Sequence, residues 1–199
     1  MEETNLTEQE SMLIIQQMIN TAKHEQKDDG IGWIIWGWLL FVVSILTYIN
    51  LQTNWFSTWF FWNSFGVLSL LLLAYSIVRF FFFKGRVRAK TYTGELFHKL
   101  NVGFFISLGF IIIGTNRGID PLRAFPLLIG LYGFWILIYG TALEFKPSVI
   151  AAYVTWALGL AAFFVNRFET VMLLHGAAAL FGYIIPGHIA YSQFRKLNR

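Results

Sequence analysis

The sequence predicts an all-α protein, a polytopic bundle of transmembrane helices, and two observations carry this prediction. Only 13% of the 199 residues are charged and 56% are hydrophobic, whereas soluble domains carry about 25% charged residues. In addition, residues 30–78 contain no Asp, Glu, Lys or Arg. A helical crossing of the bilayer needs about 20 apolar residues, so this stretch is long enough to cross twice with a turn between.

Further apolar segments follow along the chain, separated by short polar turns. We expect six transmembrane spans arranged as three helical hairpins, which together form a domain over residues 30–190. An even number of spans places both termini on one side of the membrane. The predicted spans cover residues 31–49, 55–83, 100–115, 124–143, 148–165 and 170–185.

Lysine and arginine fall mainly on one side of this predicted topology. Residues 84–90, directly after the second span, are rich in both and contain no acid. Of the 15 Lys and Arg residues, only Arg117, Arg123 and Arg167 lie on the opposite side. Cytoplasmic loops carry an excess of these residues, so we expect both termini in the cytoplasm, with a basic tail over residues 191–199. A basic run this short and this close to a span is typical of an orienting loop, and we expect no nucleic-acid partner.

Residues 1–29 form the markedly polar part of the chain. Thr7 and Glu10 have the spacing of a capping box, which predicts an amphipathic cytoplasmic helix over residues 8–26. This segment is acidic, whereas helices that lie on membranes are usually basic. It is therefore interpreted either as a solvated helix that packs on the protein's own cytoplasmic face or as a docking helix for a second protein.

Two groups of tryptophans stand where the first two spans begin. Tryptophan is enriched at both membrane interfaces, so an aromatic belt explains them. A cage for a cationic ligand is the alternative, although no acid lies within these spans to support it. The two groups are Trp33, Trp36 and Trp38, and Trp55, Trp59 and Trp62.

Small residues recur every four positions on the last two spans. Such stripes allow helix backbones to approach closely in a membrane. They predict either that the last hairpin is the tightest part of the bundle or that spans five and six form a homodimer. The stripes are Ala151, Thr155 and Gly159 on the fifth span, and Ala178, Gly182 and Pro186 on the sixth.

Ionisable residues inside the bilayer are candidate functional groups because their burial is costly. His175 lies within the predicted sixth span. It is interpreted either as a neutral histidine hydrogen-bonded inside the bundle or as a proton- or ligand-responsive group.

A second candidate site lies at the predicted cytoplasmic end of the bundle. Pro186 and the glycine after it are expected to end or kink the sixth helix, which places His188 at the cytoplasmic mouth. Glu144 and Lys146 occupy the turn between spans four and five, at the same level. These residues are interpreted either as a polar ligand-responsive cluster or as ordinary interfacial residues.

Several classes of chemistry find no support in the sequence. The chain has no cysteine, which removes thiol catalysis, disulfides and thiolate metal sites. Glu95 and His98 have the spacing found in di-iron helices, but the second motif and the additional glutamates are missing. We therefore expect no metal, no cofactor and no catalytic residues.

Four segments together resemble a family of small, uncharacterised bacterial inner-membrane proteins with six spans. They are Trp-Ile-Ile-Trp-Gly-Trp at residues 33–38, Leu-Tyr-Gly-x-Trp at 131–135, Glu-Phe-Lys-Pro at 144–147 and Tyr-Ile-Ile-Pro-Gly-His at 183–188. The resemblance covers most of the chain and implies a multi-pass protein of the bacterial inner (plasma) membrane. No activity is assigned to that family, so the resemblance implies none here.

These observations favour a non-catalytic sensory or accessory subunit that acts through its cytoplasmic face. A small-molecule transporter or permease unit is the alternative, although transporters usually carry broken helices or buried charges near mid-membrane. A membrane-embedded enzyme is the second alternative. Besides the lipid bilayer, the expected partners are a cytoplasmic protein bound through residues 8–26 and a second copy of this chain.

Overall fold

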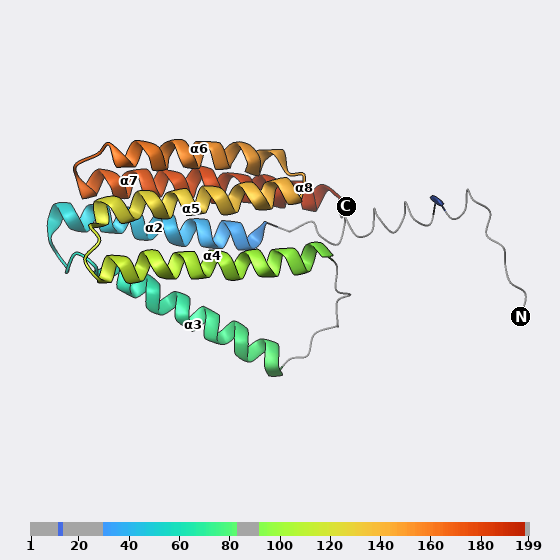
Figure 1. Cartoon of the computed structure of the whole chain (residues 1–199), viewed down its shortest axis with the longest axis horizontal. Coiled ribbons are helices and arrows are strands. Elements are labelled where there is room, and N and C mark those ends of the chain that lie inside the picture. The colour runs from blue at the N-terminus through green and yellow to red at the C-terminus, as the bar shows by residue number, and fades with distance from the viewer. Residues whose placement is uncertain (1–11, 14–29, 83–91, 198–199) are drawn as a thin grey trace, which may run out of the picture.

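The computed structural model describes residues 12–13, 30–82 and 92–197, and within them every regular element is a helix. The helices run up and down as a bundle (Figure 1). They are α2 (Ile31–Thr53), α3 (Phe60–Phe82), α4 (Tyr92–Asn116), α5 (Pro121–Ala142), α6 (Lys146–Phe163), α7 (Phe168–Ala179), a π-helical turn η1 (Leu180–Ile184) and α8 (Ile185–Leu197).

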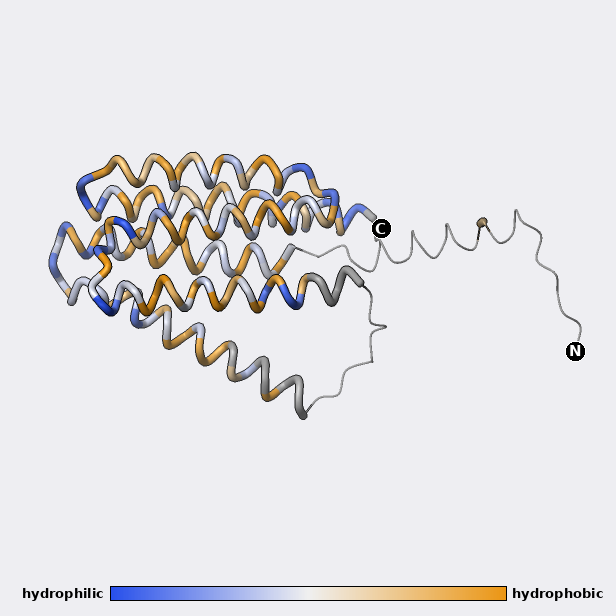
Figure 2. The backbone as a smooth tube through the Cα atoms, viewed as in Figure 1, coloured by the Kyte–Doolittle hydropathy of each residue, from blue (hydrophilic) through white to orange (hydrophobic). Residues whose placement is uncertain are grey.

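The predicted all-helical bundle with membrane-compatible helices is confirmed. Five helices are long and apolar enough to cross a membrane, and α3 adds a shorter apolar stretch over Phe60–Leu72. Figure 2 shows apolar residues along the bundle and hydrophilic residues gathered towards its two ends. The architecture therefore fits a multi-pass membrane protein, while a count of six spans stays a prediction. The predicted N-terminal helix, apart from residues 12–13, and the basic run at 84–90 lie outside the described residues.

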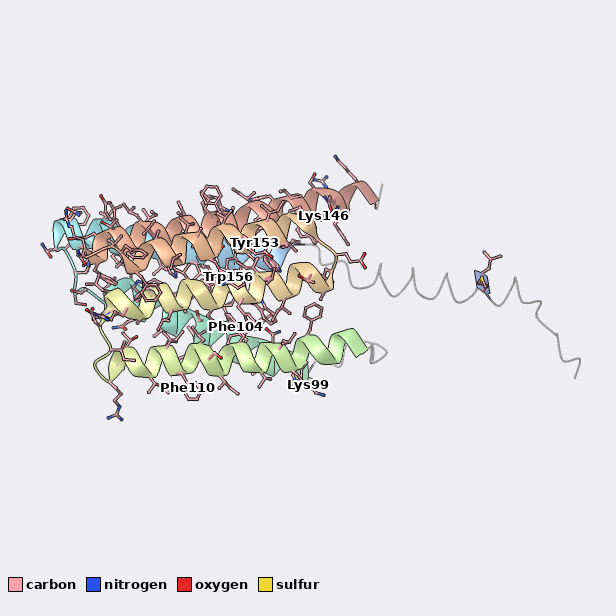
Figure 3. The ribbon with its side chains drawn as sticks, turned by 45° about the horizontal axis from the view of Figure 1, so that its top comes forward. Lys99, Phe104, Phe110, Lys146, Tyr153 and Trp156 are labelled. Carbon is pink, nitrogen blue, oxygen red and sulfur yellow. The ribbon has the colours of Figure 1, made fainter. Side chains whose placement is uncertain are left out.

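Helices α5 and α6 pair more closely than the two helices of the last hairpin, which the small-residue stripes predict to be the tightest part of the bundle. The reason lies in glycines on α5, which the stripes did not include. Gly133 packs directly under the Trp156 ring, and a Cβ on Gly140 would lie 2.7 Å from Ser148 Cβ. Trp156 Nε1 also donates a hydrogen bond to Gly130 O at 2.9 Å. Figure 3 shows Trp156 between the two helices.

The small-residue stripes are nevertheless buried inside the single chain. Gly159 contacts Ile129 of α5, and Gly182 contacts Thr155 of α6. The remaining stripe residues are buried as well. A homodimer through α6 and α7 would therefore use the other, exposed faces of these helices.

Helix α2 packs along the whole last helical rod, formed by α7, η1 and α8. Close approach depends on one glycine from each side of this contact, near the N-terminal end of α2. A Cβ on Gly37 would lie 2.8 Å from Tyr183 Cβ, and one on Gly187 would lie 2.9 Å from Ile34 Cγ1. The first and last parts of the chain are thus joined, and together with α5 and α6 they form the core.

Helices α3 and α4 lie outside this core. In the span-length part of α4, over Phe97–Asn116, no residue is buried, and Phe104 of α4 leans on Trp135 of α5 with ring centroids 5.4 Å apart. Helix α3 is inclined to the other helices, and its C-terminal end lies away from the bundle (Figure 1). Near its N-terminus, Trp59 and Trp62 pack against the core.

The last helix does not end at Pro186, as one reading of the sequence predicted. It continues as α8 to Leu197, so much of the segment assigned to a basic tail is helical. Proline lacks an N–H and its ring would clash with the carbonyl four residues earlier. The π-helical turn directly before Pro186 widens the helix there, and the Ile185 N–H bonds Leu180 O, five residues back. The chain therefore accommodates the proline with an irregular turn rather than a stop.

Candidate functional site

The most buried ionisable candidate from the sequence is His175, on α7. Its side chain is 1% exposed, and it lies roughly 10 Å along the helix from Phe168 by helical rise. The Nδ1 atom is 2.8 Å from Ser44 Oγ of α2. This hydrogen bond joins the first helix of the bundle to the last one across the core.

Three aromatic rings from two further helices surround the imidazole. The ring centroids of Trp62, Phe125 and Tyr132 lie 5.3, 5.6 and 5.6 Å from that of His175, with interplanar angles of 83°, 78° and 66°. Such edge-to-face contacts are a favourable arrangement for aromatic rings. We call His175, Ser44, Trp62, Phe125 and Tyr132 the His175 cluster.

The hydrogen bonds of Ser44 fix the tautomer of the imidazole. Ser44 Oγ lies 2.6 Å from Leu40 O and donates its single proton to that carbonyl. It must then accept from His175, so Nδ1 carries the proton of a neutral ring. Nε2 is consequently a bare acceptor.

Two complementary polar atoms of the cluster have no partner. His175 Nε2 and the indole Nε1 of Trp62 are both buried without a hydrogen bond. Leaving a buried donor or acceptor unpaired costs about 1–3 kcal/mol. The cluster therefore holds one unused acceptor and one unused donor on rings that are in contact.

The other candidates lie elsewhere. Glu144, Lys146 and His188 are all exposed, and none belongs to the His175 cluster. Glu144 and Lys146 flank the turn between α5 and α6, and Figure 3 shows Lys146 at the end of the bundle. His188 follows Gly187, which contacts Ile34 in the first turn of α2. Of the predicted site residues, only His175 occupies an enclosed environment.

Sequence reasoning found His175 but not the residues around it. Trp62 was assigned to an interfacial belt, yet its ring faces the core, whereas Trp36, Trp38 and Trp55 are exposed as a belt requires. Ser44 could have been found, because Ser44, Thr47 and Asn50 recur every three residues within an apolar helix and all three are buried. That polar stripe marks the face of α2 that points inward.

Metal binding receives no support from the part of the chain that the structure describes. Within residues 12–13, 30–82 and 92–197, no three His, Asp or Glu side chains gather into a group that could hold an ion. What the cluster offers is hydrogen bonding to a neutral group inside an aromatic enclosure.

Comparison of the chain with protein-family models, with curated proteins and with solved structures finds no match. The resemblance to a bacterial six-span family therefore stays a prediction. On its architecture, the chain is an all-helical bundle whose long apolar helices fit a multi-pass integral membrane protein.

Proposed function

We propose that this chain is a non-catalytic sensory or accessory subunit of the bacterial inner membrane, which acts through its cytoplasmic face. The observation that carries the proposal is the long packing of α2 against the α7–α8 rod. The same two elements meet at the Ser44–His175 hydrogen bond inside the core and again at Gly30 and Gly187 at one end of the bundle.

This contact connects the core to the end of the bundle where Gly30 and α8 lie. A Cβ on Gly30 would lie 3.0 Å from Ala190 Cβ of α8. Residues 1–29 thus join α2 directly beside α8, whose exposed face carries Arg195 and Lys196. A shift of α7 relative to α2 at His175 would change the contact between Gly30 and α8.

The irregular turn η1 lies between the two contact points. Single π-helical turns inside α-helices often occur at functional sites, and here Tyr183 of η1 touches both Tyr132 and Trp33, with ring centroids 5.8 and 5.4 Å apart. Because Tyr132 also borders His175, the turn is in aromatic contact with the cluster. It is the element through which a change at His175 would reach α8.

The test uses photo-cross-linking in native membranes. A photoreactive residue at exposed Gln193 of α8 is expected to yield one discrete protein adduct, and the same residue at exposed Asn116, at the other end of the bundle, is expected to yield none. Deleting residues 1–26 should abolish the adduct while leaving the size-exclusion profile of the bundle unchanged. Equal adducts from both positions, or an adduct indifferent to the deletion, would refute the accessory role.

A transporter remains the competing function, favoured by the π-helical turn inside an apolar helix. Transporters build their sites from discontinuous helices. Saturable uptake of a solute by proteoliposomes that contain only this chain would support transport and contradict the accessory role.

A further inference from the structure

We propose that the His175 cluster binds the hydroxyl group of a small, neutral, membrane-soluble alcohol. The hydroxyl oxygen accepts a hydrogen bond from the Trp62 indole N–H, and the hydroxyl proton is donated to His175 Nε2. The proposal that the cluster binds an alcohol depends only on the geometry of the cluster. The further proposal that the alcohol is the signal to which the subunit responds rests on the proposed function.

The two unpartnered atoms are complementary in hydrogen bonding. Trp62 Nε1 can only donate, whereas Nε2 of the neutral His175 can only accept, since Ser44 occupies Nδ1. A hydroxyl group both donates and accepts. A hydroxyl group therefore offers the type of partner that each of the two atoms lacks, and the two rings that carry these atoms lie 5.3 Å apart between centroids.

A third unpartnered atom lies on the same helix as Trp62. Ser69 Oγ is also buried without a hydrogen bond, and it follows Trp62 by seven residues, on the same face of α3. Within the described part of the chain, the buried unpartnered side-chain atoms are these three. Two of them lie on the face of α3 that is turned to the core, and the third lies on the ring that Trp62 touches. Buried polar atoms at the boundary between α3 and the core thus lack hydrogen-bond partners.

An alcohol suits this site better than water or a cation. Water would satisfy the same two atoms but would keep its second hydrogen unpaired among aromatic rings, and buried waters typically make about three hydrogen bonds. A cation bound at Nε2 would leave the Trp62 indole N–H without a partner, because that atom only donates. The apolar part of an alcohol packs instead against the rings of Phe125 and Tyr132, which border the imidazole.

Access to the site is from the bilayer, past α3. That helix contacts the core near its N-terminus and then inclines away (Figure 1). Its outward residues include Leu70, Leu71 and Tyr75, each more than half exposed. A molecule dissolved in the membrane therefore reaches the cluster by displacing the first turns of one outlying helix.

The experiment is ¹⁵N NMR of the full chain in lipid nanodiscs, labelled at histidine and tryptophan. The chain has 4 histidines, so the His175 signal is assignable by substitution. Cyclohexanol is expected to move the Nε2 resonance of His175 and the indole resonance of Trp62 saturably and with one dissociation constant. Methylcyclohexane, which has no hydroxyl group and no oxygen, is expected to move neither.

Matched variants separate the donor from general packing. Trp62→Phe should weaken cyclohexanol binding about tenfold, as expected for one lost hydrogen bond in a buried site. Trp59→Phe, in the turn directly before α3 and packed on Phe168 instead, should leave binding unchanged. The indole readout in the unmodified chain keeps the test valid even if Trp62→Phe does not fold.

Three outcomes would overturn the inference. A direct coupling between the Trp62 indole proton and His175 Nε2 would show that the two rings satisfy each other. An Nε2 resonance that shows a hydrogen bond before cyclohexanol is added, and that does not move when it is added, would show that a water molecule already occupies the site. Equal responses to both probes would show partitioning only. All of these NMR readouts measure binding to the purified chain and do not depend on the proposed function. If no cross-link forms at Gln193 while cyclohexanol still binds, the sensory role is refuted and the binding site is not.

Discussion

Replacing Ser44 by alanine tests how α2 is fastened to the last helix. The substitution removes two hydrogen bonds: the bond from Ser44 Oγ to Leu40 O and the bond from His175 Nδ1 to Ser44 Oγ. The first costs little, because Leu40 O also serves the backbone of its own helix. The second leaves the Nδ1 donor of a 1%-exposed histidine without a partner.

The expected loss is about 1–2 kcal/mol in the free energy of unfolding. An unpaired buried donor costs about 1–3 kcal/mol, while hydrogen bonds between helices in membranes average about 0.6 kcal/mol. The matched control is Thr47→Val, which removes a hydroxyl bonded only to its own helix, at Val43 O. That near-isosteric change is expected to cost less than about 0.5 kcal/mol.

The assay is reversible unfolding of the purified chain in mixed micelles, followed by tryptophan fluorescence and circular dichroism. A double-mutant cycle with His175→Phe isolates the interhelical bond, and its coupling energy is expected to be about 1 kcal/mol. Equal losses for Ser44→Ala and Thr47→Val, or a coupling energy near zero, would refute the reasoning. The tautomer assigned to His175 would then fall as well, because only this bond fixes the Nδ1 proton.

Three further predictions concern the pairing of α5 with α6, the loop between α2 and α3, and the membrane topology. Gly133→Ala should destabilise the bundle by about 2 kcal/mol through overpacking against an indole ring of α6, whereas Gly130→Ala, whose Cβ would meet no atom within 4 Å, should leave the melting temperature unchanged. Asn50→Ala should cost about 2 kcal/mol, because its amide makes three hydrogen bonds to the α2–α3 loop at 2.8–3.2 Å; an unchanged unfolding midpoint would contradict this. In a chain without native cysteine, Asn116→Cys should react with an impermeant maleimide in intact cells and Ser192→Cys should not, and the reverse pattern would invert the topology.

The helices themselves were predictable because their length is set by the apolar segments. The expected fourth span at residues 124–143 and the observed α5 differ by only a few residues. The N-terminal end of α5 lies earlier than expected because the helix continues beyond the apolar segment into a capped turn, in which Asp120 accepts a hydrogen bond from Leu122 N at 3.0 Å.

The neighbours of each helix were not predictable in the same way. A stripe such as Ala151, Thr155 and Gly159 shows which face can be approached closely, but not by which helix. The stripe has two partners: Gly159 contacts Ile129 of α5, and Thr155 contacts Gly182 of η1. The closest α5–α6 contacts lie outside the stripe, where Gly133 and Gly140 of α5 meet Trp156 and Ser148 of α6. Pairing depends on the shapes of both surfaces, and single-helix periodicity reports only one of them.

The candidate site was likewise predictable only in part. His175 was predictable because one ionisable residue stands inside an apolar segment. The residues that surround it come from α2, α3 and α5, which lie far from α7 in sequence. The spacing of residues along the chain therefore does not indicate them. Trp62 was misassigned for a related reason: a tryptophan near a helix end suits both an interface and a core, and only the packing distinguishes the two.

The pairing of α2 with the α7–α8 rod has a consequence for how the protein is made. The first helix of the bundle to leave the ribosome finds its main partner only when the last has been synthesised. Until then its inward face, with Ser44, Thr47 and Asn50, has no partner from the rod. Non-local contacts of this kind close late, and the incomplete chain is exposed to wrong association and degradation in the interval. Quality control should therefore act most strongly on chains truncated before Phe168, since these have every earlier helix and still lack a closed core.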